Sequence, residues 1–114
     1  YPLATPAYNV SQKFNKLGRG TMIPIIGYDL VEDQFTGDHA AKWETSLLMH
    51  LRPELVDLSL LDPDPENKPI GVLGEDPRTL PGHEGASAEY GRRGMDAMTE
   101  ALRERVAEAL REDS

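Results

Sequence analysis

Apolar residues recur at helical spacing between Asp38 and Arg52, which is the clearest pattern in the chain. The positions are Ala40, Trp43, Leu47, Leu48 and Leu51, and their spacing places them on one side of a helix. The Asp38 carboxylate can accept the free amide groups of a first turn. Pro53 ends the helix, because the residue before a proline is pushed out of the helical conformation. The pattern predicts an amphipathic helix from Asp38 to Arg52.

Two further stretches have the composition of β-strands. Residues 55–61 are mostly apolar, which predicts a buried strand. Residues 21–28 are also rich in β-branched residues, but Pro24 cannot donate to a ladder, so we expect an edge strand or an extended segment there. Residues 70–73 form a brief apolar segment before Gly74. Residues 1–20, where prolines and glycines lie among polar residues, are expected to be irregular, with residues 12–20 as either a short helical turn or a loop.

A second helix is predicted at the end of the chain. Ser87 is a good N-cap, and Glu89 lies in the first turn, where its charge complements the helix dipole. Gly91 and Gly94 lower the helix propensity of the early turns, and they also permit close packing against a neighbour. The apolar stripe of this helix comprises Met95, Met98, Leu102, Val106 and Leu110. Two helices and up to three strands indicate an α/β class, with little sheet for a free-standing domain.

Composition narrows the classes of partner. The chain has 114 residues and a formal net charge of -8, which argues against binding to nucleic acid or to an anionic membrane surface. It has no cysteine, so disulfides and thiolate metal sites are excluded. No apolar run is long enough to span a bilayer, and no signal segment is visible; we therefore expect a soluble protein of the cytoplasm. Because the first residue is Tyr, we expect a processed product or one piece of a larger protein.

Three residues of the first helix are candidates for chemistry. His39, beside Asp38 at the helix entry, could transfer protons near neutral pH or could only hydrogen-bond locally. Glu44 shares the apolar side of the helix, where an acid must be paired if it is buried; it would then orient groups of a site, or else it reaches solvent. If both residues are helical, Glu44 lies about 140° round the helix from His39. Trp43 is expected in the core or an interface, with pocket lining as the alternative.

The same stretch resembles the creatininase (creatinine amidohydrolase) family. The matching features are Asp-His-Ala, then Glu-Thr-Ser and an apolar helix, then Arg-Pro-Glu-Leu-Val, all within residues 38–56. Residues 71–78 and the Ala-Ser-Ala-Glu-Tyr-Gly stretch at 86–91 are similar to the end of that family. The resemblance covers residues 37–112. It implies that residues 37–114 are the C-terminal half of a layered αβα fold completed by another polypeptide. Residues 1–36 carry no motif of the family, and from their composition we expect an irregular, edge-strand segment.

The resemblance also implies an activity, namely metal-dependent hydrolysis of an amide or cyclic amide in a small-molecule substrate. It makes His39 the catalytic proton-transfer residue and gives Asp38, Trp43 and Glu44 a place in the pocket or in support of it. The cofactor would be divalent metal, two ions of zinc or manganese, bound mainly by residues outside this chain. His83 and Glu84 are residue types that bind metal, but they lie in a glycine-flanked loop without a third ligand at a suitable spacing. We therefore interpret them as loop residues and not as a metal-binding pair. Partners would be a polypeptide carrying the N-terminal half, in a hexamer-like homo- or hetero-oligomer, and the chain would be inactive without it.

The chain departs from the family pattern at one place, and two alternatives to the implied activity remain open. Family members have a small residue followed by an acid after His-Ala, whereas this chain has Ala41 and Lys42, which leaves the substrate open. The first alternative is a non-catalytic scaffold or binding subunit that retains half of the fold. The second is a related hydrolase that cleaves a carbon–carbon or carbon–oxygen bond.

Overall fold

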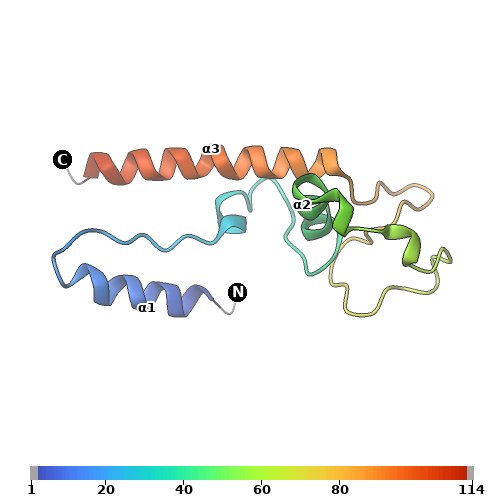
Figure 1. Ribbon diagram of the computed structural model, residues 1–114, viewed down its shortest axis with the longest axis horizontal. Helices are drawn as coiled ribbons and strands as arrows, with labels where there is room; N and C mark the ends of the chain where they lie inside the picture. The colour runs from blue at the N-terminus through green and yellow to red at the C-terminus, as the bar shows by residue number, and fades with distance from the viewer. Residues whose placement is uncertain (1–2, 113–114) are drawn as a thin grey trace. The chain divides into compact units, whose positions relative to one another are not determined.

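The computed structural model describes residues 3–112, and the chain divides into two units (Figure 1). The first unit extends to Leu30 and contains helix α1 (Ala4–Asn15) and a 3-10 turn, η1 (Gly27–Leu30). The second unit begins at Val31 and contains the remaining elements, which are α2 (Lys42–Leu51), η2 (Pro53–Leu55), η3 (Leu58–Leu60) and α3 (Ala88–Glu112). The two predicted helices correspond to α2 and α3, and both belong to the second unit.

The first unit differs from the prediction at its start, because residues 4–15 form a helix rather than an irregular segment. Between residues 21 and 28 no strand is assigned, which excludes the edge strand and leaves the extended segment of the two alternatives. The Asn15 side chain explains part of the absence of a strand, because its amide donates to the Met22 carbonyl at 3.1 Å and its oxygen accepts the Met22 amide at 2.7 Å. Both ladder groups of Met22 are thus taken by a side chain, and Pro24 has no amide hydrogen to offer.

Close packing of α2 against α3 organises the second unit. A Cβ built on Gly94 would lie 2.6 Å from the Trp43 ring, and one built on Gly91 would overlap the Ser46 carbonyl. Only a residue without a side chain permits this approach of two helices, so the packing role expected of the two glycines is confirmed. Beside the crossing, the Phe35 ring lies 4.8 Å from that of Trp43 and 5.6 Å from that of Tyr90, measured between centroids.

The buried strand predicted at residues 55–61 is wrong, and no sheet of the predicted α/β class is assigned among residues 3–112. The segment consists of the short turns η2 and η3, and the Asp57 carboxylate holds η3 by accepting the Ser59 amide at 3.0 Å. Within residues 3–112 the extended pairings are the isolated bridges His39–Leu73 and Leu80–His83, and no strand is assigned. A strand needs neighbours for its ladder; apolar composition alone does not supply them. Leu55 and Leu60 accordingly remain 61% and 83% exposed.

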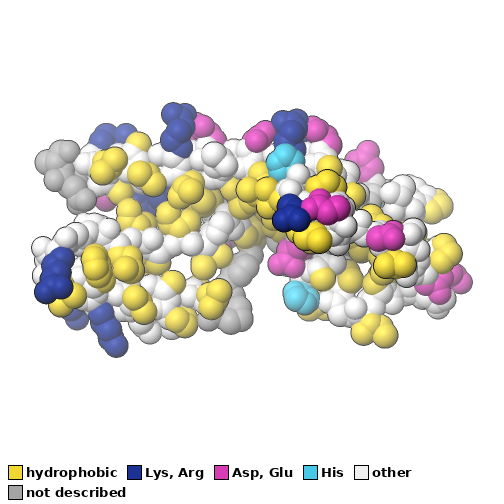
Figure 2. All heavy atoms as spheres, viewed as in Figure 1, with side chains coloured by type: hydrophobic (Ala, Val, Ile, Leu, Met, Phe, Trp, Pro, Cys, Tyr) yellow, Lys and Arg dark blue, Asp and Glu magenta, His cyan; other side chains and the backbone are white. Residues whose placement is uncertain are grey.

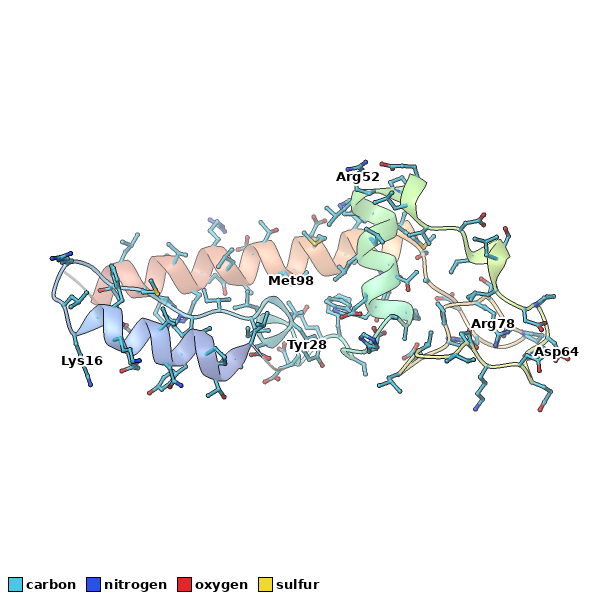
Figure 3. All side chains as sticks on the ribbon, turned by 60° about the horizontal axis from the view of Figure 1, so that its bottom comes forward. Lys16, Tyr28, Arg52, Asp64, Arg78 and Met98 are labelled. Atoms are coloured by element: carbon cyan, nitrogen blue, oxygen red, sulfur yellow. The ribbon has the colours of Figure 1, made fainter. Side chains whose placement is uncertain are left out.

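The long loop between η3 and α3 is organised by Arg78, a residue that the sequence pattern did not single out. Its side chain is buried and lies among the loop residues near Asp64 (Figure 3). The guanidinium donates to the Asp76 carboxylate at 2.7 Å and to the carbonyls of Asp62 and Asp64 at 2.5 and 2.9 Å. The short hydrogen bond to Asp76 holds the pKa of that carboxyl below its usual range. One guanidinium therefore supplies hydrogen bonds to several polar groups of the loop and holds its segments together.

The surface of the second unit carries apolar side chains as well as charges. Leu102, Val106 and Leu110 on the second half of α3 are 41%, 44% and 65% exposed, and apolar patches are visible along that helix in Figure 2. Among residues 3–112, no helix combines the length and the apolar character needed to cross a bilayer.

Candidate functional site

The turn before α2 is held by the carboxylate of Asp38. The helix begins at Lys42, and Ala41 is its N-cap by backbone conformation. Asp38 nevertheless accepts the first-turn amides of Trp43 at 2.6 Å and of Glu44 at 3.2 Å. The predicted capping role of Asp38 is therefore confirmed, although it acts from three residues before the N-cap. Because the helix starts at Lys42 and not at Asp38, His39 lies in the turn.

The turn is fastened to a second segment by backbone hydrogen bonds. His39 and Leu73 exchange both amide-to-carbonyl bonds, each 2.9 Å long, and the Lys42 amide donates to the Glu75 carbonyl at 3.0 Å. Gly74 has a φ of 132°, and a Cβ built on it would lie 2.5 Å from the Asp38 Cβ. A side chain at position 74 would push the two segments apart, so this glycine is needed for the position of His39.

His39 and Glu44 lie together on the outside of this turn. Their side chains are 69% and 52% exposed, and the His39 Nδ1 lies 3.9 Å from the Glu44 Oε2. The same carboxylate oxygen accepts the Ala40 amide at 2.8 Å. The angle of about 140° required both residues to be helical, and His39 is not, since α2 begins at Lys42. Glu44 reaches over the turn, which agrees with the alternative in which it reaches solvent.

Trp43 lies behind the turn and is only 3% exposed. Its ring is part of the aromatic cluster with Phe35 and Tyr90, which agrees with the core role. Its amide is the group capped by Asp38. Through this hydrogen bond Trp43 connects the packed interior to Asp38, the residue before His39.

A depression of about 370 Å³ is lined by Lys42 at the start of α2, by the loop before α3 and by the first turns of α3. Tyr90 is one of the lining residues, and its ring centroid lies 4.5 Å from the Lys42 ammonium and 5.3 Å from the Arg93 guanidinium carbon. Lys42 also pairs with Glu75 at 3.4 Å. This group was not predictable from the sequence, because its residues come from segments far apart in the chain.

His83 borders the same depression, and its Nε2 lies 2.8 Å from the Asp76 carbonyl oxygen. The ring is thus held by its own loop, as the loop interpretation of this residue expects. Among residues 3–112, no three His, Asp or Glu side chains are grouped so that they could hold a metal ion. The side chains of that part of the chain do not fit a metal centre.

Comparison with known proteins gives one match. The family model Creatininase, described as creatinine amidohydrolase, matches residues 24–106. The match covers the His39 turn, α2, the Arg78 loop and most of α3, and it begins before residue 37, in a stretch where we found no motif. No curated protein and no solved structure matches the chain.

Proposed function

Because the chain belongs to the creatinine amidohydrolase family, we propose that it forms part of a metal-dependent hydrolase that cleaves an amide or cyclic amide, with His39 as its proton-transfer residue. The observation that carries the proposal is the His39 turn, which lies within the matched residues. It presents an exposed imidazole on a backbone fixed by Asp38, Leu73 and Gly74. A catalytic group needs this combination of access and fixed position.

The chemistry assigned to His39 follows from what amide hydrolysis requires. The nitrogen that leaves must gain a proton, and an imidazole can donate one near neutral pH. Glu44 places a carboxylate 3.9 Å from Nδ1, so this side of the ring faces a protein group and Nε2 remains for the substrate. In this proposal His39 is the residue that exchanges the proton, and Glu44 and Asp38 position it.

The proposal includes a second polypeptide. Family members of this kind depend on divalent metal, and the residues between 3 and 112 do not group to bind one. We assign the metal ligands, for two ions such as zinc or manganese, to a polypeptide that carries the N-terminal portion of the fold. The assembly would be a homo- or hetero-oligomer, and this chain would contribute the proton-transfer residue to its site.

The test begins with the composition of the purified assembly. Denaturing mass spectrometry identifies every polypeptide present, metal analysis follows, and hydrolysis is then assayed with creatinine and with simple cyclic amides.

His39→Ala should lower kcat by a factor of about 10² to 10⁴, the usual contribution of a general acid or base. His50→Ala is the matched control, because His50 lies at the far end of α2, and it should retain turnover. Full turnover by His39→Ala would exclude the proposed role, and an assembly without metal or hydrolysis would favour the scaffold alternative.

A further inference from the structure

Leu73 is directly opposite His39 across the bridge that fastens the turn. The two residues exchange both backbone hydrogen bonds, which defines a hydrogen-bonded antiparallel pair, with Cα atoms about 5.5 Å apart. Side chains that are directly opposite in such a pair project to the same side of the ribbon. The imidazole of His39 and the isobutyl group of Leu73 therefore share one face.

The neighbouring pair establishes which face this is. Asp38 and Gly74 are the next residues across the bridge, and a Cβ built on Gly74 would lie 2.5 Å from the Asp38 Cβ. That face points inward, because the Asp38 carboxylate caps the amides of α2. Successive residues of extended chain alternate between faces, so His39 and Leu73 project outward. Their exposures agree, at 69% for the His39 side chain and 68% for Leu73.

From this pairing we infer that Leu73 is a specificity-determining residue of the proposed enzyme and contacts the apolar part of the substrate that His39 serves. The inference rests on the proposed function. An exposed leucine alone has no special meaning; Leu73 differs from the others because its backbone is fixed beside an imidazole. A substrate nitrogen within reach of His39 brings the adjoining carbon atoms against the isobutyl group. The substrate class is thus amides that carry an alkyl or ring carbon group beside the bond to be cleaved.

A crosslinking experiment tests the shared face without any need for activity. The chain has no cysteine, so the double variant His39→Cys, Leu73→Cys contains a single thiol pair. The Cβ atoms of such a pair lie about 5 Å apart, slightly wider than the separation of about 3.5–4.5 Å that a disulfide needs. A short thiol-to-thiol reagent such as dibromobimane should therefore close an intramolecular bridge, seen by mass spectrometry. The control, His39→Cys with Leu60→Cys, should not form one. A double variant that keeps its helical circular dichroism but does not crosslink would overturn the inference.

Kinetics of the assembled enzyme test the specificity. Leu73→Ala should lower kcat/KM about tenfold for an amide that carries an alkyl group beside the cleaved bond, and should leave the amide without that group nearly unchanged. Leu60→Ala, on η3, should alter neither value. Equal losses on both substrates, or weakened assembly with the ratio unchanged, would overturn the inference and leave the proposed function intact. Absence of hydrolysis by the wild-type assembly would overturn both.

Discussion

Gly91 of α3 lies directly against the backbone carbonyl of Ser46 on α2. The buried Ser46 hydroxyl also accepts the amide of Ser87 at 3.0 Å, and the Ser87 hydroxyl accepts the Tyr90 amide at 3.0 Å as the N-cap of α3. Ser46 is therefore joined to α3 twice, once at its start and once a turn later. This arrangement fixes the crossing of the two helices and with it the position of Trp43, whose amide is bound by Asp38.

Gly91→Ala should destabilise the second unit by about 2–3 kcal/mol, because the added methyl group would overlap the Ser46 carbonyl and the helices would have to separate. Urea unfolding followed by tryptophan fluorescence measures the effect. The chain has a single tryptophan, and it lies in this helix pair.

The matched control is Gly20→Ala. A Cβ at position 20 would meet only the Phe14 ring, at 3.8 Å, which is an ordinary contact. This substitution should leave the tryptophan-monitored transition in place. Equal midpoints for Gly91→Ala and the wild type would contradict the close helix crossing.

Asp38→Ala should cost about 1 kcal/mol of stability, the usual value of a capping side chain. Its two hydrogen bonds to the amides of Trp43 and Glu44 would be lost. In the assembled enzyme it should also lower kcat, because the His39 turn loses its inner support. Asp33→Ala, at an exposed position, is the control and should change neither quantity. Loss of activity in both variants would indicate a general charge effect and not a role for the turn.

The sequence was sufficient for features that depend on local chemistry. The Ser87 cap, the capping carboxylate of Asp38 and the small residues at the helix crossing are all properties of short stretches, and the structure has each of them. The family resemblance likewise rested on contiguous motifs, and the match over residues 24–106 confirms it.

Features that depend on distant partners were not predictable in the same way. Residues 55–61 have the composition of a strand, but a strand exists only where other segments accept its hydrogen bonds. In the sequence alone, Arg78 is not distinguishable from other loop arginines. Its role depends on the fold, which places the carbonyls of Asp62 and Asp64 within hydrogen-bond distance of its guanidinium. His39 and Glu44 would lie on different sides of a helix if both were helical, and they meet because the helix begins at Lys42.

Arg78→Lys should destabilise the second unit more than any exchange of an exposed arginine. A lysine has one compact ammonium group and cannot donate at once to the Asp76 carboxylate and to the loop carbonyls as the guanidinium does. Arg103→Lys is the control, because Arg103 pairs with Glu100 on the open surface of α3, where such pairs contribute little. Both variants are compared by their urea midpoints. Indistinguishable midpoints would contradict the organising role of Arg78.

The Asp76–Arg78 pair also predicts how stability depends on pH. The hydrogen bond from Arg78 lowers the pKa of Asp76 below its value of 3.8 in an unfolded chain, so the folded state favours the ionised form. This stabilisation is complete above about pH 5 and is lost as the pH falls through 4 towards the lower pKa of the folded state. The free energy of unfolding, measured in urea between pH 6 and pH 2.5, should decline over that acid range. Asp76→Asn should flatten the decline, whereas Glu100→Gln, which removes a carboxyl group that is 54% exposed, should preserve most of it. A wild-type decline that Asp76→Asn leaves unchanged would show that other carboxyl groups cause the acid sensitivity.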